Sequence, residues 1–378
     1  MQASTRLGFG CGSDACVGCG CDCSARSAGN KHHLHLHKYV LLHLNLTTNL
    51  NLTTNLNLNT NLNHPHPHIH TSPHTHTYIP THSHTHTHVE WVFSSLDGDV
   101  YTLDERDGNL SPQGSFNWTD PPNLEMTLSA DLSAGDPAGG VAYFVANNVG
   151  EEEASVVIAV DTTSSPITFS SSPILPFSIG GIHVNPSDNT LVVLAITGRT
   201  SLQVLSLSPE SYKVTNLTTP LEDVELVPSS GTAFNGEEQI LTAMLFTHTF
   251  GLRLVSLNCS SQAIQWYPQV RVSPVNMAYA PDHGMIIGIA GGGIVPVDAF
   301  LLSAEDGSIS NVTQITEGLG AFAQVTFAYS SHSGGLLVGV PRFSGSSKIT
   351  YVDTSSTPFS VVATWHVAYE NAQIIVAL

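Results

Sequence analysis

Five cysteines near the N-terminus have a spacing that could bind a metal ion. They are Cys11, Cys16, Cys19, Cys21 and Cys23, which form the pattern C-x4-C-x2-C-x-C-x-C. Thiolates at this density could ligate a soft ion such as zinc. A folded zinc module usually pairs two ligand couples across a loop of about 12–20 residues, and no second couple follows here. We interpret the cluster as compositional bias with adventitious metal affinity.

Histidines form a second group of potential ligands. They begin with His32, His33, His35 and His37 and recur from His64 to His88. Neutral imidazole binds zinc, copper or nickel, so these tracts could chelate metal non-specifically. Residues 44–63 read LNLTTNLNLTTNLNLNTNLN and residues 64–88 read HPHPHIHTSPHTHTYIPTHSHTHTH. Low-complexity tracts of this kind carry histidine through compositional bias, not through site geometry.

The composition changes abruptly near Val89. Residues 1–88 hold 15 of the 20 histidines and five of the six cysteines, and their net charge is +2. Residues 89–378 hold 28 acids and 7 bases, a net charge of −21. We predict a disordered low-complexity segment over 1–88 and one folded domain over 89–378. Because His-Thr alternation is what a CA dinucleotide repeat encodes, we also expect the first segment to be a translated simple repeat upstream of the true start.

The charge balance of the whole chain limits its partners. Among 378 residues, 11 are Lys or Arg and 30 are Asp or Glu, which gives a net charge of −19. A surface that binds phosphates needs clustered cations, so this composition argues against nucleic acid. We expect no transmembrane segment, because no apolar run approaches the about 20 residues that a span requires.

The cellular compartment depends on where translation begins. No apolar stretch of the length of a signal-peptide core follows Met1. We expect an extracellular protein if the true start carries a signal peptide, and a cytoplasmic one otherwise. Five N-x-S/T sequons, slightly more than chance would give, are candidate glycosylation sites on an exported surface: Asn109, Asn117, Asn216, Asn258 and Asn311.

The second part of the chain repeats a strand, a polar turn and an apolar strand. This first pattern occupies residues 126–146, 181–196, 231–246, 276–290, 325–340 and 365–378. Its turns are spaced 52, 48, 46, 50 and 39 residues apart, measured at Asp136, Asp188, Gly236, Asp282, His332 and Asn371. A period of about 40–50 residues indicates a repeat architecture.

A second pattern, two alternating strands joined by a turn, accompanies each of these units. It occupies residues 99–112, 155–169, 201–214, 251–267, 297–310 and 348–362. Its turns contain Asp-Gly, Ser, Pro and Asn, which suit hairpins. Each unit therefore predicts four short strands, a–b–c–d, in which strand b is apolar throughout and buried on both faces. Such four-stranded units are typical of an all-β propeller.

Three of the c–d hairpins carry a recognisable local motif. Tyr101-Thr102-Leu103-Asp104 leads to Gly108, and Ile158-Ala159-Val160-Asp161 and Tyr351-Val352-Asp353 match its first half. The motif resembles that of the β-propeller superfamily, and within it the YVTN-type and quinoprotein amine dehydrogenase-like repeats. The resemblance covers nearly all of 91–378 but marks architecture and not activity. WD40 repeats differ by their Trp-Asp and Gly-His dipeptides, which are missing here.

The strand count favours six blades, with seven as the alternative. Six a-strands, six c–d hairpins and seven b-strands are expected, the extra b-strand being residues 91–96. The ring closes if a C-terminal strand a over 365–370 completes the N-terminal blade, which leaves one b-strand surplus. A seventh blade would need parts that this chain lacks.

Candidate functional residues lie where propeller loops surround a central channel. Those expected near strand a or in the b–c loops are Asp131, His183, Arg199, His248, Arg253, Arg342 and His366. A lactonase-type propeller would hold a divalent cation on the axis through oxygen ligands, for which the candidates are Asp131, Glu225, Asn276 and Glu370. Contacts for a quinone cofactor are not identifiable, and the cofactor stays unknown.

Two functions are compatible with this architecture. The first is a non-catalytic, monomeric propeller that binds a protein or glycan partner on one ring face, where an acidic surface favours a basic partner. The alternative is a lactonase- or quinoprotein-dehydrogenase-type enzyme with a divalent cation or cofactor at the channel mouth. Three or more carboxylate or amide oxygens converging on the axis would favour the enzyme. A mouth lined by Ser, Thr and aliphatic residues would favour the binding module.

Overall fold

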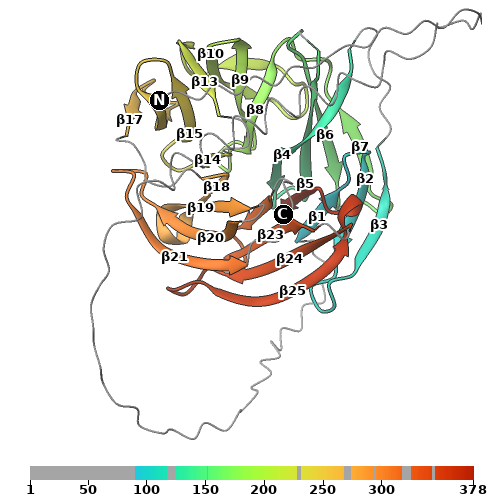
Figure 1. The fold of residues 1–378 in the computed structure, drawn as a ribbon. Coiled ribbons are helices and arrows are strands. Elements are labelled where there is room, and N and C mark those ends of the chain that lie inside the picture. Colours follow the sequence, from blue (N-terminus) through green and yellow to red (C-terminus); the bar gives the residue numbers. More distant parts are fainter. Residues whose placement is uncertain are drawn as a thin grey trace, which may run out of the picture. The chain divides into compact units, whose positions relative to one another are not determined.

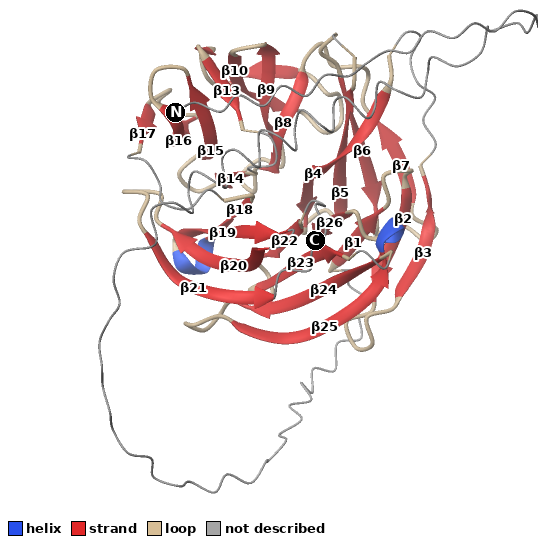
Figure 2. Cartoon of the chain, viewed as in Figure 1, coloured by secondary structure: helices blue, strands red, loops and turns tan. Residues whose placement is uncertain are grey.

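The residues that the structure describes, all within 90–378, form a ring of six small antiparallel sheets (Figures 1 and 2). The coordinates are a computed structural model, and they describe residues 90–116, 124–150, 152–227, 231–267, 274–292, 295–316, 325–342 and 345–378. The predicted disorder over 1–88 and the metal candidates there lie outside these residues. The domain boundary between 88 and 89 stays a prediction.

The first three blades are each named from the innermost strand outward. Blade 1 consists of β26 (Ile374–Ala377), β1 (Trp91–Ser94), β2 (Asp99–Leu103) and β3 (Leu110–Ser115). Blade 2 consists of β4 (Met126–Asp136), β5 (Val141–Asn148), β6 (Ser155–Asp161) and β7 (Thr168–Ser171). Blade 3 consists of β8 (Ser178–Val184), β9 (Leu191–Gly198), β10 (Ser201–Leu207) and an outer strand split into β11 (Val214–Asn216) and β12 (Leu221–Glu222).

The remaining three blades follow the same order. Blade 4 has an inner strand split into β13 (Val224–Leu226) and β14 (Thr232–Asn235), then β15 (Ile240–Thr247), β16 (Gly251–Asn258) and β17 (Ile264–Trp266). Blade 5 consists of β18 (Asn276–Ala280), β19 (Met285–Gly292), β20 (Val295–Leu302) and β21 (Ile309–Thr316). Blade 6 consists of β22 (Thr326–Ser330), β23 (Gly335–Pro341), β24 (Ser346–Asp353) and β25 (Ser360–Ala368).

Burial is highest in the second strands, as the sequence predicts, and lower in innermost strands such as β4 and β8. In β9, residues 191–195 are fully buried, and β23 is buried along its whole length. The third strands β10 and β24 alternate as predicted, whereas β16 and β20 are buried in an unbroken run over part of their length. The outer strands β11 and β17 are exposed. The second strands are buried on both faces because a neighbouring blade covers each face.

The closing blade corrects one detail of the sequence prediction. Residues 365–368 belong to β25, the outermost strand of blade 6, and not to an inner strand a. The inner strand of blade 1 is β26, which pairs antiparallel with β1 so that Trp91 lies opposite Ala377. Residues 91–96, counted in the sequence as the extra b-strand, contain β1, which is the second strand of blade 1; the apolar strand that is not a b-strand is β26. Its apolar run resembles a b-strand because the inner strand of blade 1 is also covered on both faces.

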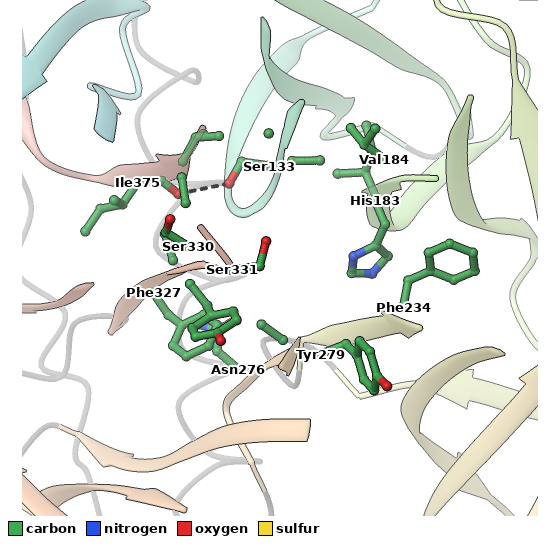
Figure 3. Close-up of a pocket in the computed structure, with 18 of the residues that line it drawn as sticks. Ser133, His183, Val184, Phe234, Asn276, Tyr279, Phe327, Ser330, Ser331 and Ile375 are labelled. Carbon is green, nitrogen blue, oxygen red and sulfur yellow. Dashed lines mark hydrogen bonds between the residues drawn. The ribbon is translucent and has the colours of Figure 1, made fainter. Parts of the chain in front are cut away.

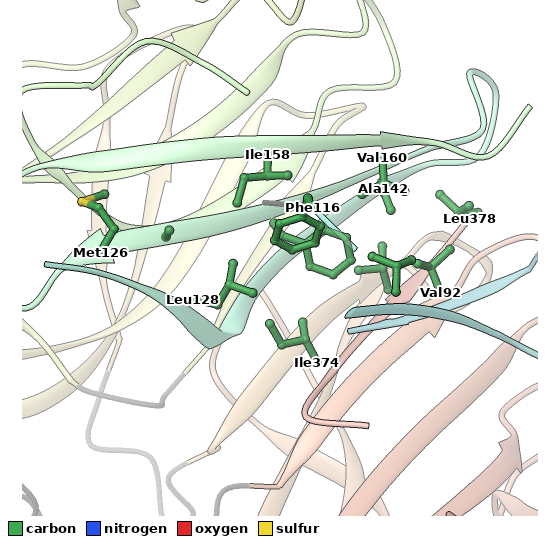
Figure 4. Close-up of a cluster of buried hydrophobic side chains, with 13 residues drawn as sticks. Val92, Phe116, Met126, Leu128, Ala142, Ile158, Val160, Ile374 and Leu378 are labelled. Atoms are coloured by element: carbon green, nitrogen blue, oxygen red, sulfur yellow. The ribbon is translucent and has the colours of Figure 1, made fainter. Parts of the chain in front are cut away.

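The hydrophobic core consists of six clusters, one between each pair of neighbouring blades. Figure 4 shows the cluster between blades 1 and 2, where Val92, Ile374 and Leu378 pack near Leu128 and Ile158. A last cluster joins blade 6 to blade 1. Each blade is therefore held by apolar contacts on both sides, and the ring has no free blade face.

A glycine permits the closest backbone approach at the closure. A Cβ atom at Gly135 of β4 would overlap the carbonyl oxygen of Ala377 in β26. Ser133, two residues earlier, donates a hydrogen bond from its hydroxyl to the carbonyl of Ile375 at 3.2 Å. The inner strands of blades 1 and 2 are thus in direct backbone contact.

The aspartates of the family-like motif are turn residues. The Oδ1 atoms of Asp104, Asp161 and Asp353 accept hydrogen bonds from the backbone N–H two residues later, at 2.8–2.9 Å. Asn258 and Ser303 accept equivalent bonds in two further c–d turns. This Asx geometry explains the residue type at the position by local turn chemistry.

Helical structure is confined to two short 3-10 turns in the described ranges, η1 (Pro281–His283) and η2 (Tyr369–Asn371). No helix among these residues is long and apolar enough to cross a membrane.

We predict that Ile374→Ala destabilises the domain by about 2–5 kcal/mol, because the side chain is fully buried in the cluster that closes the ring. Urea unfolding followed by tryptophan fluorescence measures the change. The matched control is Ile264→Ala on the outer strand β17, where 42% of the side chain is exposed and the expected loss is below about 1 kcal/mol. Equal losses in the two variants would contradict closure through β26.

Candidate functional site

The inner strands of all six blades line a central cavity of about 220 Å³. Figure 3 shows His183 and Phe234 on one side of it and Ser133 and Ile375 on the other. The lining also includes Pro137 and Ser331 of two a–b turns. The cavity therefore reaches the end of the ring at which the a–b turns lie.

The a–b turns give a common reference point from which equivalent positions of the inner strands can be compared. Counted back from each four-residue turn, Phe234, Tyr279 and Tyr329 occupy one repeat position in blades 4, 5 and 6. Val184 and Gly135 occupy it in blades 3 and 2, and all five residues line the cavity. The sequence analysis missed these aromatics. Their recurrence one residue before the end of strand a was the signal that could have found them.

His183 stands out at the preceding repeat position. The other blades with an a–b turn have alanine there, at Ala134, Ala233, Ala278 and Ala328. A small residue suits a position where inner strands pack closely. The imidazole of His183 therefore replaces a methyl group and fills space beside the channel.

Its contacts tie His183 to the next blade. The Nε2 atom lies 2.8 Å from the hydroxyl of Thr232, and the ring stacks on Phe234 with a centroid distance of 6.1 Å. Burial lowers the pKa of His183 from 6.5 to about 4. At neutral pH the imidazole is uncharged and adds no positive charge to the cavity.

Other polar groups of the lining are bonded within the fold. The Nδ2 atom of Asn276 donates to the carbonyl of Val325 at 3.1 Å, which links blade 5 to the connection before blade 6. The hydroxyl of Ser330 accepts a bond from the N–H of Ser333 at 3.3 Å. The first bond joins blade 5 to the start of blade 6, and the second closes the a–b turn of blade 6.

The ring end that carries the a–b and c–d turns is strongly acidic. Its described turns contain only two Lys or Arg side chains, Arg106 and Lys213. Arg106 lies 3.4 Å from a carboxylate oxygen of Asp104. Nine exposed carboxylates of these turns define what we call the acidic face: Glu105, Asp107, Asp188, Glu210, Glu237, Glu238, Asp282, Glu305 and Asp306.

One carboxyl group of the acidic face, that of Glu105, is protonated more readily than an ordinary glutamate. Burial and the neighbouring Glu90 raise the pKa of Glu105 to about 7, while Trp91 donates its Nε1–H to Glu105 at 2.7 Å. Glu105 is therefore partly protonated near neutral pH. It contributes less negative charge than the other carboxylates of the face.

Three of the predicted site residues reach the central cavity. Asp131, His183 and Asn276 line the cavity, and Asp131 lies in a bulge of β4. Residues 129–132, between Leu128 and Ser133, fall outside the pairing register of β4 and β5. The backbone of the inner strand therefore bulges at this point. These three residues are the predicted candidates that the structure places at the central cavity.

The other candidates lie away from it. Arg199, His248 and Arg342 occupy b–c turns, and Arg253 follows such a turn in β16. His366 lies on the outermost strand β25, which corrects its placement on an inner strand. Glu225 lies on β13, 3.8 Å from His248, and Glu370 lies in η2. The four proposed cation ligands therefore do not converge.

Potential metal ligands are not clustered in the described part of the chain. No three His, Cys, Asp or Glu side chains there come together as a metal site requires. Cys259 is buried as a free thiol, and burial raises its pKa to about 11, so it is a poor nucleophile. The clusters Cys11 to Cys23 and His32 to His37 fall outside the described residues.

Four of the five sequons can be located. Asn109 and Asn216 are exposed, whereas Asn258 and Asn311 are partly buried. The Nδ2 atom of Asn311, to which a glycan would be attached, is buried. Asn117 lies outside the described residues. Glycosylation of these sites stays a prediction.

Comparisons with known proteins agree on the fold alone. No protein-family model matches the sequence, and no curated protein matches it. TolB from Acinetobacter baumannii is similar in structure at 9% identity and a TM-score of 0.49, over 76% of this chain and 64% of that one. A 6-phosphogluconolactonase-like protein from Bacteroides uniformis gives 12% identity, 72% and 81% coverage and a TM-score of 0.45.

Hydrazine synthase from Kuenenia stuttgartiensis is another such neighbour. It shares 13% identity over 77% of this chain and 90% of that one, with a TM-score of 0.42. The chain spans under two thirds of the TolB structure. At these values the likenesses carry no argument about activity, and the conclusion that the chain is a six-bladed β-propeller rests on its own sheet topology.

We predict that His183 makes the domain less stable at low pH. Its pKa is lower in the folded state than in the unfolded chain, so the unfolded chain binds more protons between about pH 6.5 and pH 4. The stability that the neutral ring provides is present above pH 6.5 and is lost as the pH falls to about 4. We expect a loss on the order of 2 kcal/mol, since the cavity side of the ring is open to solvent.

The measurement compares urea unfolding of the wild type and His183→Gln at pH 4.5 and pH 7.5. Glutamine cannot titrate but can still donate to the Thr232 hydroxyl. The difference in stability between the two proteins should shrink or reverse at the lower pH. A difference that is the same at both pH values would show that His183 does not titrate as described.

Proposed function

We propose that the propeller is a non-catalytic binding module that recognises a basic segment of a partner protein on its acidic face. The observation that carries the proposal is the charge of that face: nine exposed carboxylates against the two cationic side chains of Arg106 and Lys213. A surface of one sign attracts partners of the opposite sign, speeds their association and excludes polyanions.

Turn chemistry accounts for some of these acids but not for all of them. Asp188 and Asp306 accept hydrogen bonds from their own turns, which is a sufficient structural reason for an aspartate. Glutamate is too long for this Asx role, so Glu210, Glu237 and Glu305 have no such reason. Their presence supports a role for the charge itself.

The cavity supports surface recognition over small-molecule chemistry. Pockets that enclose drug-sized ligands usually measure about 300–1,000 Å³, and this one measures about 220 Å³. Of the four oxygen ligands considered for a lactonase-type cation, Asp131 and Asn276 line the cavity. The enzyme alternative therefore receives less support from the site.

A protein partner suits the acidic face better than a neutral glycan. The electrostatic field of the carboxylates stabilises a cationic ligand, whereas an uncharged sugar gains little from it. A propeller with all six blade interfaces closed has no blade face left for self-association, so we expect a monomer that binds the partner at its turns.

We predict that the domain binds a fluorescent Lys-rich nonapeptide and that Glu237→Lys weakens this binding about threefold to tenfold. The substitution replaces an attractive charge with a repulsive one at an exposed turn. Fluorescence anisotropy at 50 mM NaCl measures the affinity. Raising the salt to 300 mM should weaken the binding at least tenfold, because salt screens exposed charges.

The matched control is Glu152→Lys, which changes the net charge equally but lies in a b–c turn on the opposite end of the ring. It should change the affinity less than twofold. Equal effects of the two variants would show that only net charge matters and would refute a defined acidic face. Salt-independent binding to neutral oligosaccharides, without binding to the peptide, would contradict the protein partner. Cation-dependent hydrolysis of a sugar lactone would support the enzyme alternative instead.

A further inference from the structure

The outermost strand of blade 6, β25, lies on the rim of the ring with one edge unpaired in the described part of the chain (Figure 1). Residues 363–368 of this strand pair with residues 346–351 of β24 in unbroken register, and no other described strand pairs with β25. Because the hydrogen bonds of a strand alternate between its two edges, about three of these six residues direct their N–H and C=O groups outward. The edge therefore presents the backbone groups that an added strand would use.

The outer strands of the other blades present shorter or interrupted edges. Strand β7 has four residues, β17 has three, and the outer strand of blade 3 is split into β11 and β12. Strand β3 contains Pro112 and a register shift, and β21 contains two register shifts. Short strands, proline and bulges protect an edge against pairing with another chain. The one shift in β25 lies at Val362, near its start, and leaves the longest regular edge among the described outer strands.

The composition and the anchoring of β25 suit strand pairing. Its sequence, SVVATWHVA, contains no Asp, Glu, Lys, Arg, Pro or Gly, and Val361 and Val362 are 47% and 60% exposed. β-Branched and aromatic residues favour extended structure. Val367 is buried, and Trp365 packs so closely against Gly108 of blade 1 that a Cβ atom there would overlap the Trp365 side chain. An edge that is already held in place loses little conformational entropy when a strand is added.

Acidic residues flank this uncharged strand at both ends. Asp353 of β24 lies opposite Ser360, the first residue of β25, and the exposed Glu370 follows two residues after the strand ends. Residues 89–378 carry 28 acids and 7 bases, so a second copy of the chain would be repelled. A segment with an uncharged middle and a lysine or arginine at each end would be attracted instead. The charges and the unpaired edge therefore favour one kind of occupant, an extended segment of another protein.

We propose that the outer edge of β25 binds an extended segment of a partner protein, which becomes a fifth strand of blade 6. The main chain of the segment pairs with residues 363–368, and its flanking cationic side chains lie near Asp353 and Glu370. Main-chain hydrogen bonds supply the affinity in this mode of recognition, and alternate side chains supply the specificity. The edge lies on the rim of the ring, so the inference does not depend on the acidic face and adds a second surface to it.

The probe for the edge is a fluorescent peptide, Lys-Thr-Val-Thr-Val-Thr-Val-Lys. With the full chain at pH 7.5, fluorescence anisotropy should give a Kd on the order of 100 μM. The matched control peptide is N-methylated at every residue between the two lysines, so it keeps its side chains and charges but loses the main-chain donors of its middle. It should bind at least tenfold more weakly, because strand addition needs those donors. Equal binding of the two peptides would overturn the proposal.

Hydrogen exchange with mass spectrometry measures where the peptide binds. Saturating peptide should slow exchange at least threefold over residues 363–368 and leave the outer strands β11 and β17 unchanged. Protection elsewhere, without a change at 363–368, would refute the site. Full protection of 363–368 before peptide is added would also refute a partner: a second copy holds the edge if this protection falls on dilution, and the chain itself covers the edge if it does not.

A proline in β25 tests the edge from the side of the protein. Thr364→Pro should weaken binding of the strand peptide at least fivefold, because proline removes an N–H donor and disturbs regular strand pairing. The matched control is Thr215→Pro on the exposed outer strand β11, which should change the affinity less than twofold. Thermal unfolding verifies that each variant is folded, and the exchange measurement on the wild type decides the question if Thr364→Pro does not fold. Unchanged binding in a folded Thr364→Pro protein would refute the site.

The two proposals fail in different ways. Thr364→Pro should change the affinity for the Lys-rich nonapeptide less than twofold, and Glu237→Lys should change the affinity for the strand peptide less than twofold. If the strand peptide loses affinity in Glu237→Lys but not in Thr364→Pro, it binds the acidic face and the inference about β25 is wrong. If the nonapeptide does not bind but the strand peptide protects residues 363–368, the acidic-face proposal is wrong and the β25 edge stands.

Discussion

Pairing between β1 and β26 is the interaction on which the rest of the structure depends. Four residues from each end of the folded domain form one antiparallel ladder, in which Trp91 lies opposite Ala377 and Ser94 opposite Ile374. Without β26, blade 1 would lose its inner strand, and the apolar clusters on both of its sides would be open to water. Because every blade needs two covered faces, the loss would reach all six blades through their shared cores.

The same closure creates the candidate site. Six inner strands meet around one axis only when the ring is complete, and their repeat-equivalent positions then become a lining of Val184, Phe234, Tyr279 and Tyr329. The four-residue a–b turns that end these strands carry exposed carboxylates, among them Asp188, Glu237 and Asp282. We propose that this face attracts a basic partner. Recognition would then follow directly from how the blades are connected.

The sequence predicts the blades better than it predicts the site. The period, the hairpin turns and the apolar b-strands indicate six blades, because these features are local and the same in every repeat. The closing strand was placed wrongly at 365–370 because an inner strand covered on both faces has the composition of a b-strand. His183 and Asn276 were found, but Glu225 and Glu370 were grouped with them because sequence gives no distance between blades. The aromatic lining appears only when the a–b turns are aligned.

The central claim is that β1 and β26 form a stable ladder in the intact protein. Native-state hydrogen exchange with mass spectrometry measures this directly in peptides that cover residues 91–94 and 374–377. We expect both peptides to exchange as slowly as β9 and β15 and to lose protection together as urea is added. Rapid exchange at 374–377, with β9 and β15 still protected, would show an open ring and would contradict the account.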